Sequence, residues 1–235
     1  MNKLVRNLLS ISLATGVVLG SASSSPAASV TIDPSSSWIG YMNVTDLPSN
    51  GGAYMFGSSW GTADLCATFS GPVLTLAPNT IGDPNAYWYT PAGGPGSVGN
   101  KIMDAVMYVE TTPGLFTGQT LTFSGDVLSN TLVGNHDANG NGWTSVAFVK
   151  DFAPDYSSSV MTTVPLVNGV FNVSLATIND PGRHIQYGFE TIGPDVWVTD
   201  VAPYGNVQVT AVPEPSTLAL IGLGFAGLIV VRRRK

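Results

Sequence analysis

The chain has 235 residues, a formal net charge of −6 at pH 7 and a single cysteine. This length suits one domain of ordinary size with terminal segments, and the lone Cys66 excludes an intramolecular disulfide. Six of the nine basic residues lie in the first six or the last four positions, so the body between has three basic and fourteen acidic residues, a net charge of −11. So acidic a body would repel a phosphate backbone, which excludes nucleic-acid binding.

Residues 1–28 have the pattern that is typical of a secretory signal peptide. Two basic residues precede an apolar stretch from Leu8 to Leu19, and small residues follow it. Cleavage fits after Ala22, Ala27 or Ala28, and the sequence alone does not choose among them. We therefore expect the secretion machinery to be a partner of this protein.

Residues 29–211 form the body, and their pattern predicts β-structure throughout. Apolar and polar residues alternate in short runs that are bounded by turn-forming residues, and no stretch has helical periodicity over three turns. The clearest runs are Ile102–Thr111, Leu121–Ser124, Trp143–Phe152, Val170–Leu175, His184–Glu190 and Val207–Val209. About eight to ten such strands predict an all-β fold, an antiparallel two-sheet sandwich of the jelly-roll type.

A long loop from Pro78 to Asn100 contains the aromatic run Tyr87-Trp88-Tyr89. On an extended chain, alternate side chains of this run point to opposite sides. The rings could stack on the apolar faces of sugars while nearby Asp83 and Asn85 bond to hydroxyl groups, which predicts a sugar-binding platform. The alternative is that one side of the run closes an end of the sandwich.

The segment Asp137-Ala138-Asn139-Gly140-Asn141-Gly142 resembles the opening of an EF-hand calcium loop. Asp137, Asn139 and Asn141 would supply the oxygen ligands. The twelfth position, however, holds Phe148 where a bidentate Glu is needed, and an Asn- and Gly-rich hairpin turn explains the same residues without a metal. We therefore expect no cofactor, with calcium as the alternative.

The sequence contains no recognisable catalytic motif. It has no Gly-x-Ser-x-Gly elbow, no His-Glu-x-x-His motif and only two histidines. Acidic residues such as Asp151 with Asp155, Glu190 with Asp195, and Asp200 lie near expected strand ends or turns, where carboxylates are normally solvated. We therefore expect a protein that is not an enzyme, with a secreted polysaccharide hydrolase as an alternative.

The last 24 residues form a separate unit, residues 212–235. Val212-Pro213-Glu214-Pro215 precedes an uncharged, largely apolar run from Leu218 to Val231, and Arg232-Arg233-Arg234-Lys235 ends the chain. The prolines prevent a helix before them, and a helix after them would be about 25 Å long, close to the thickness of a bilayer core. Four cations predict that its C-terminal end is cytoplasmic.

This tail resembles the PEP-CTERM sorting signal of Gram-negative bacteria. The resemblance implies export, an intermediate held in the inner membrane by the C-terminal helix, recognition of Pro-Glu-Pro by the membrane enzyme exosortase, and delivery to the cell surface or extracellular matrix. Within the body, Ala147–Phe152 and Gln186–Phe189 resemble elements of carbohydrate-binding jelly rolls.

We therefore expect an exported, non-catalytic protein that is structural or binds exopolysaccharide. Ice binding is a further alternative, because it is also associated with this kind of tail. Such an activity requires a regular array of threonine-rich strands, and the threonines of the body show no repeat period.

Overall fold

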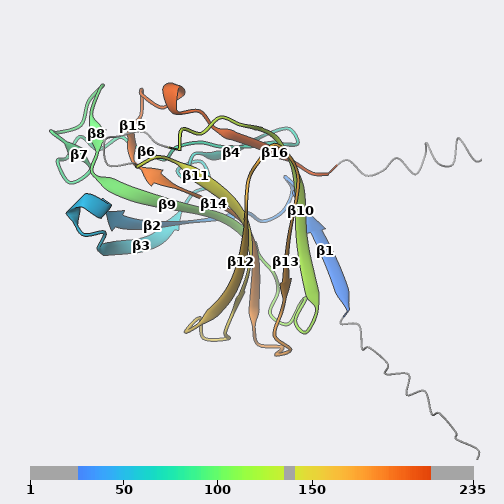
Figure 1. The fold of residues 1–235 in the computed structure, drawn as a ribbon. Coiled ribbons are helices and arrows are strands. Elements are labelled where there is room, and N and C mark those ends of the chain that lie inside the picture. Colours follow the sequence, from blue (N-terminus) through green and yellow to red (C-terminus); the bar gives the residue numbers. More distant parts are fainter. Residues whose placement is uncertain (1–25, 135–140, 213–235) are drawn as a thin grey trace, which may run out of the picture.

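The computed structural model describes residues 26–134 and 141–212, which form two six-stranded sheets and two pairs of short strands (Figure 1). Sheet A consists, in order, of β1 (Ala27–Thr31), β10 (Thr120–Asn130), β16 (Val207–Thr210), β5 (Val73–Leu76) and β4 (Ala67–Ser70), and β13 (Gly169–Ala176) also pairs with β10. Sheet B consists, in order, of β12 (Ser159–Pro165), β11 (Thr144–Phe152), β14 (His184–Pro194), β9 (Lys101–Glu110), β2 (Ile39–Asp46) and β3 (Tyr54–Trp60).

The remaining elements are short. The two small pairs are β6 (Thr80–Ile81) with β15 (Val196–Trp197), and β7 (Tyr89–Thr90) with β8 (Val98–Gly99). Two 3-10 helices, η1 (Pro48–Asn50) and η2 (Ala202–Tyr204), are the only helical elements among the described residues.

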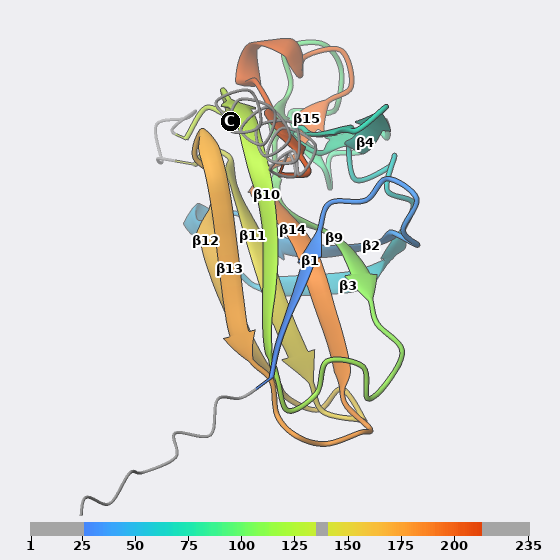
Figure 2. The same ribbon diagram turned by 90° about the vertical axis from the view of Figure 1, so that its right-hand side faces the viewer.

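One hydrophobic core lies between the two sheets (Figure 2). On β10 the side chains of Leu121, Phe123 and Val127 are buried, and alternate residues face outward. Phe123 meets Phe189 of β14 in the other sheet, with ring centroids 5.3 Å apart. Burial of one such side chain contributes about 2–3 kcal/mol, so the period-two pattern of the sequence accounts for the way the sheets face each other.

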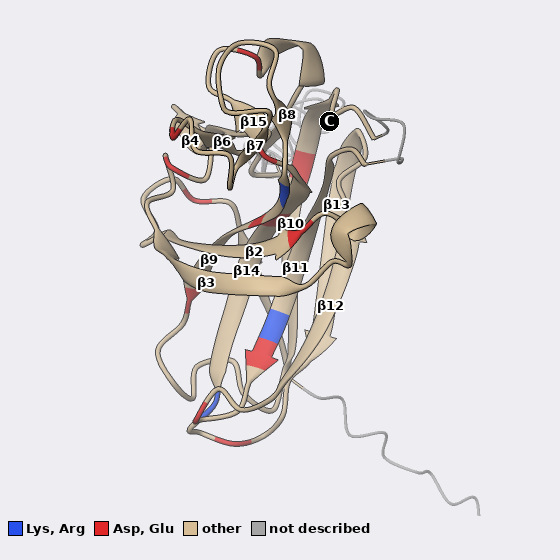
Figure 3. Cartoon of the chain, turned by 90° about the vertical axis from the view of Figure 1, so that its left-hand side faces the viewer, with Lys and Arg blue, Asp and Glu red and all other residues tan. Residues whose placement is uncertain are grey.

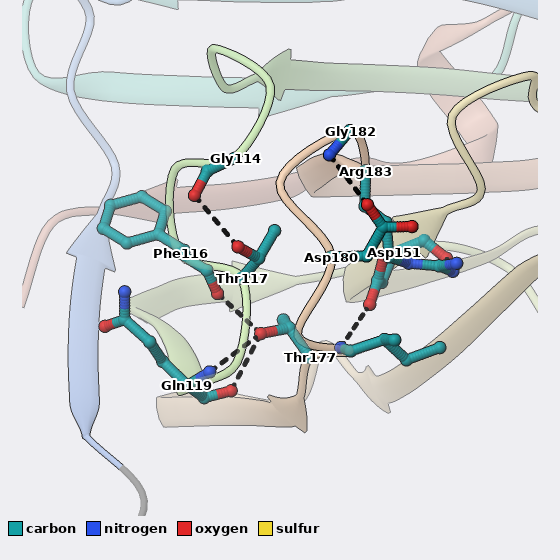
Figure 4. Close-up of polar contacts among 10 residues, drawn as sticks. Gly114, Phe116, Thr117, Gln119, Asp151, Thr177, Asp180, Gly182 and Arg183 are labelled. Carbon is teal, nitrogen blue, oxygen red and sulfur yellow. Dashed lines mark hydrogen bonds and ion pairs between the residues drawn. The ribbon is translucent and has the colours of Figure 1, made fainter.

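A buried ion pair ties loops together at one end of the sandwich (Figure 4). Asp151 on β11 is fully buried, and its Oδ1 accepts a hydrogen bond from Nε of Arg183 at 2.6 Å. Its Oδ2 accepts from the backbone N–H of Ile178 at 2.8 Å. The hydroxyl of Thr177 donates to the backbone carbonyls of Phe116 and Gln119 nearby. Because both charges are compensated inside the protein, the loops before β10 and β14 have defined positions.

The structure confirms the predicted all-β fold, and each of the six predicted runs matches a strand, with Thr111 and Trp143 just outside β9 and β11. The expected number of strands is too low, because several strands have only two residues and β3 contains the non-alternating sequence YMFGSSW. The purely antiparallel arrangement is wrong: β1 runs parallel to β10, and β15 parallel to β6. The edge of β10 from Thr120 to Ser124 is left open by β16, and β1 fills it.

The predicted terminal segments lie mainly outside the described residues. Among residues 26–134 and 141–212, the structure has no helix that is long and apolar enough to cross a membrane, and the predicted C-terminal span lies beyond them. The predicted boundary between the signal peptide and the body, between residues 28 and 29, falls inside β1.

Candidate functional site

The outer face of sheet B contains a cavity lined by polar and aromatic side chains. On β9 the even-numbered residues from Asp104 to Glu110 point outward, because Met103 and Met107 are buried in the core. The cavity has a volume of about 470 Å³. We call it the groove, and its lining residues are Tyr41, Asn43, Val106, Tyr108, Glu110, Lys150, Phe152, Tyr156 and Gln186.

The groove crosses four neighbouring strands: β2, β9, β14 and β11. Three steps between strands correspond to about 14 Å, which is long enough for a short stretch of a polymer. In the register of the sheet, Gly188 lies between Tyr108 and Phe148. A Cβ atom at this glycine would collide with the carbonyl oxygen of Met107. The sheet therefore packs as it does here only with glycine at this position.

Glu110 organises a hydrogen-bond network in the groove. Its Oε1 accepts from the hydroxyl of Tyr156 at 2.9 Å, and its Oε2 accepts from Nε2 of Gln186 at 2.7 Å. Nδ1 of His184 lies 3.0 Å from the same hydroxyl. Because that hydroxyl gives its proton to Glu110, Nδ1 of His184 is the donor. Partial burial, followed by the contact with Glu110, raises the pKa of Tyr156 to about 12.

Tyr156 adopts a conformation that is costly for a residue other than glycine. It has a φ of 58°, in the turn between β11 and β12. Its backbone N–H donates to the carbonyl of Ala153, and Asp155 caps the backbone N–H of Ser157. The ring also stacks on His184, with centroids 4.4 Å apart. These contacts hold an exposed aromatic ring against the groove. Backbone strain of the kind that the positive φ of Tyr156 implies is often found at functional sites.

Two carboxyl groups, Asp104 and Glu190, interact beside the groove. Nδ2 of Asn43 donates to Oδ2 of Asp104 at 3.0 Å. Burial raises the pKa of both carboxyls, and the charge of Asp104 raises the pKa of Glu190 further, against the opposing effect of Lys150. With both groups ionised, Oδ1 of Asp104 is buried without a donor among the described residues. A proton held by Glu190 would supply that donor, so the geometry favours one proton shared between the two carboxyls.

The three basic residues of the body are all engaged. Lys101 is buried and its Nζ lies 2.9 Å from Asp46, and Arg183 is paired with Asp151. Lys150 is the only basic residue of β11 (Figure 3), and its Nζ lies over the ring of Phe152, 4.5 Å from the centroid. Around the groove this single cation is outnumbered by the carboxyls of Glu110, Asp104 and Glu190.

The predicted aromatic platform Tyr87-Trp88-Tyr89 lies outside the groove, and its three rings differ in accessibility. Tyr89 is fully buried, and its hydroxyl donates to the carbonyl of Ile81 at 2.6 Å. Trp88 packs partly buried against the core and against Phe56. Tyr87 remains partly accessible beneath Nζ of Lys101, which lies 4.3 Å from the ring centroid. Tyr89 is therefore not accessible to a sugar, because its ring closes the end of the sandwich.

The two predicted polar partners of that platform shape the loop. Oδ1 of Asp83 accepts from the backbone N–H of Asn85 at 3.0 Å, and Oδ1 of Asn85 accepts from the backbone N–H of Tyr87 at 2.8 Å. Both side chains are exposed. The loop lies beside the start of β9 at Lys101, and the groove begins at Val106, about 16 Å further along the strand. The structure thus has two separate candidate surfaces.

Two of the three predicted calcium ligands, Asp137 and Asn139, lie outside the described residues. Asn141 is described and is buried. Within the described parts of the chain, no three acidic, histidine or cysteine side chains are grouped so that they could hold a metal. Of the predicted sorting tetrapeptide only Val212 is described, and Pro213 to Lys235 lie outside.

None of the site residues predicted from the sequence lines the groove. A usable signal was present in Asp104-x-Val106-x-Tyr108-x-Glu110, which places four polar or large side chains on one face of a strand. The residues that complete the site come from β2, β11, β14 and the turn between β11 and β12, and no local pattern connects them.

Comparison with known proteins gave one match. Residues 211–235 match the family model described as the PEP-CTERM protein-sorting motif. No curated protein and no solved structure matches the chain. The match covers the tail alone and supports exosortase-dependent sorting to the cell surface or extracellular space.

Proposed function

We propose, from the PEP-CTERM protein-sorting motif that this chain carries, that it is an exported exosortase substrate whose body binds polysaccharide in the groove without cleaving it. The observation that carries the binding part is a cavity of about 470 Å³ on an uncovered sheet face, lined by aromatic rings and planar polar side chains.

In the proposed route, the signal peptide exports the chain and the C-terminal helix holds it in the inner membrane. Exosortase recognises Pro213-Glu214-Pro215 and releases the body to the surface or matrix. Replacement of both prolines by alanine should leave the protein uncut in the membrane fraction, as measured by its intact mass. Unchanged processing and delivery of that variant would refute this route.

The chemistry of the groove suits sugar hydroxyl groups. A hydroxyl both donates and accepts, and the groove offers acceptors at Glu110 and donors at Gln186 and Lys150. The rings of Tyr108 and Tyr156 offer apolar surface to the C–H faces of a pyranose ring. Sites for small ligands commonly combine a few placed polar groups with such apolar walls.

The carboxyl groups are spaced poorly for hydrolysis. Asp104 and Glu190 contact each other, whereas glycoside hydrolases hold their carboxyls about 5–5.5 Å or 6.5–9.5 Å apart. Glu190 pairs with Val106 of β9 across the sheet. Glu110 lies four residues after Val106 on β9, so its backbone is about 13 Å from that of Val106. Neither separation fits a retaining or an inverting mechanism, which supports binding without catalysis.

Binding of the purified mature protein to soluble polysaccharides, measured by affinity electrophoresis, tests this proposal. We expect retention by at least one polymer and a loss of about five- to ten-fold in affinity for Tyr108→Ala, because one stacked aromatic contributes about 1–1.5 kcal/mol. Tyr87→Ala is the matched control in the long loop and should bind normally. Loss of binding on replacing Tyr87 but not Tyr108 would move the site to the loop, and absence of binding to every polymer would favour a purely structural role.

A further inference from the structure

We infer that the groove selects an uncharged polysaccharide and rejects polymers that carry carboxylate, sulfate or phosphate groups. This inference rests on the proposed binding of polysaccharide in the same groove. It concerns the chemical class of the ligand, which neither the sorting motif nor the shape of the cavity specifies.

In the described parts of the body, Lys150 is the only lysine or arginine that an anionic sugar could reach in the groove. Arg183 is buried and bonded to Asp151, and Lys101 is buried and paired with Asp46. Lys150 reaches the groove, but its charge already acts on the carboxyls of Glu190 on the adjacent strand β14 and of Asp104 on β9. Recognition of carboxylate or sulfate normally uses arginine or lysine in direct contact, and the described body offers no such side chain beyond Lys150.

The carboxyl groups of the groove favour a ligand that donates hydrogen bonds. Glu110 and the Asp104–Glu190 pair provide acceptors, and both oxygens of Glu110 already receive one donor each. A carboxylate has room for further donors. A neutral sugar hydroxyl can donate to these oxygens, whereas a uronate or sulfate oxygen can only accept. An anionic group placed there would leave lone pairs facing lone pairs in a half-buried site.

Electrostatic repulsion acts in the same direction. The carboxyls of Glu110, Asp104 and Glu190 outnumber Lys150 around the groove, and the formal net charge of the whole body is −11. A second anion about 5 Å from Glu110 would be repelled strongly enough to weaken binding about ten-fold or more. Salt screens the repulsion between Glu110 and an anion in direct contact only weakly. The remaining charges of the body act over longer distances, and their effect is screened beyond about 8 Å at physiological ionic strength.

The experiment compares one polymer backbone in two charge states. The probe is the uncharged polymer that retains the mature protein most strongly, together with its carboxymethyl derivative, both at about 0.15 M salt. We expect at least about ten-fold weaker binding to the carboxymethyl form. Glu110→Gln removes the charge at nearly constant shape and should reduce this difference several-fold.

Asp126→Asn is the matched control, because it removes the same charge on the outer face of sheet A. Asp126 faces outward because the next residue on β10, Val127, is buried in the core. It should leave the difference unchanged, and thermal unfolding of both variants checks that they are folded. Equal or tighter binding to the carboxymethyl polymer would overturn the inference while leaving the proposed binding intact. Absence of binding to any polymer would overturn both.

Discussion

At the scale of single residues, Asp195 has an unusual environment. It is 2% exposed, and its Oδ1 accepts from the backbone N–H of Lys101 at 3.0 Å. Its Oδ2 and the Oδ1 of Asn79 are both buried without a donor among the described residues. Parallel pairing of Val196 with Thr80 places Asn79 beside Asp195. One proton on Asp195, donated to Asn79, would satisfy both oxygens.

Burial raises the pKa of Asp195 to about 7. Because the pKa of an unfolded aspartate is about 3.9, the folded state retains a proton that the unfolded state loses. The contribution of this group to stability is therefore complete below about pH 4 and is lost as the pH rises towards 7.

Asp195→Asn tests this account, because its amide has the shape of the protonated acid and can donate to Asn79. We expect the variant to be more stable than the parent protein by about 1–3 kcal/mol at pH 8, with little difference at pH 4. Urea unfolding at the two pH values measures the effect. If the variant were less stable than the parent protein by the same amount at pH 4 and pH 8, the carboxyl of Asp195 would be ionised in the folded protein.

At the scale of elements, β1 bears on where the proposed signal peptide would be cut. Ala27 and Ala28 pair with Thr120 and Leu121 of β10, and the carbonyl of Pro26 accepts from the backbone N–H of Thr120 at 2.9 Å. Cleavage after Ala28 would remove two of the five strand residues. Cleavage after Ala22 would leave the whole strand in the mature protein.

We therefore predict that the mature chain begins at Ser23. Its intact mass and N-terminal sequence, determined on exported protein, measure this directly. A mature chain that begins at Ala28 or Ser29 would contradict the prediction and would imply that β1 is shortened in the exported protein.

The elements also explain what the sequence could and could not predict. Strands such as β10 and β13 alternate regularly, so their faces follow from local residues. For Tyr87-Trp88-Tyr89 the alternation is visible, but the buried side is decided by distant residues such as Trp197, whose ring lies 5.5 Å from that of Tyr89. The parallel pairing of β1 and the assembly of the groove likewise depend on contacts between residues far apart in the sequence.

For the molecule as a whole, the groove lies on a different sheet from the first and last strands. β1 and β16, the first and last strands, both belong to sheet A, whereas the groove is on the outer face of sheet B (Figures 1 and 3). A protein sorted through its C-terminal segment would thus present the groove away from that segment. This arrangement suits a binding surface that must reach polymer in the surroundings.

Hydroxyl-radical footprinting can show whether polysaccharide occupies the groove. The mature protein is oxidised with and without the best-retained uncharged polymer, and oxidation of each tyrosine is measured by mass spectrometry. We predict that bound polymer protects Tyr41, Tyr108 and Tyr156, whereas oxidation of Tyr87 is unchanged. Protection of Tyr87 with unchanged oxidation of the three groove tyrosines would contradict the account.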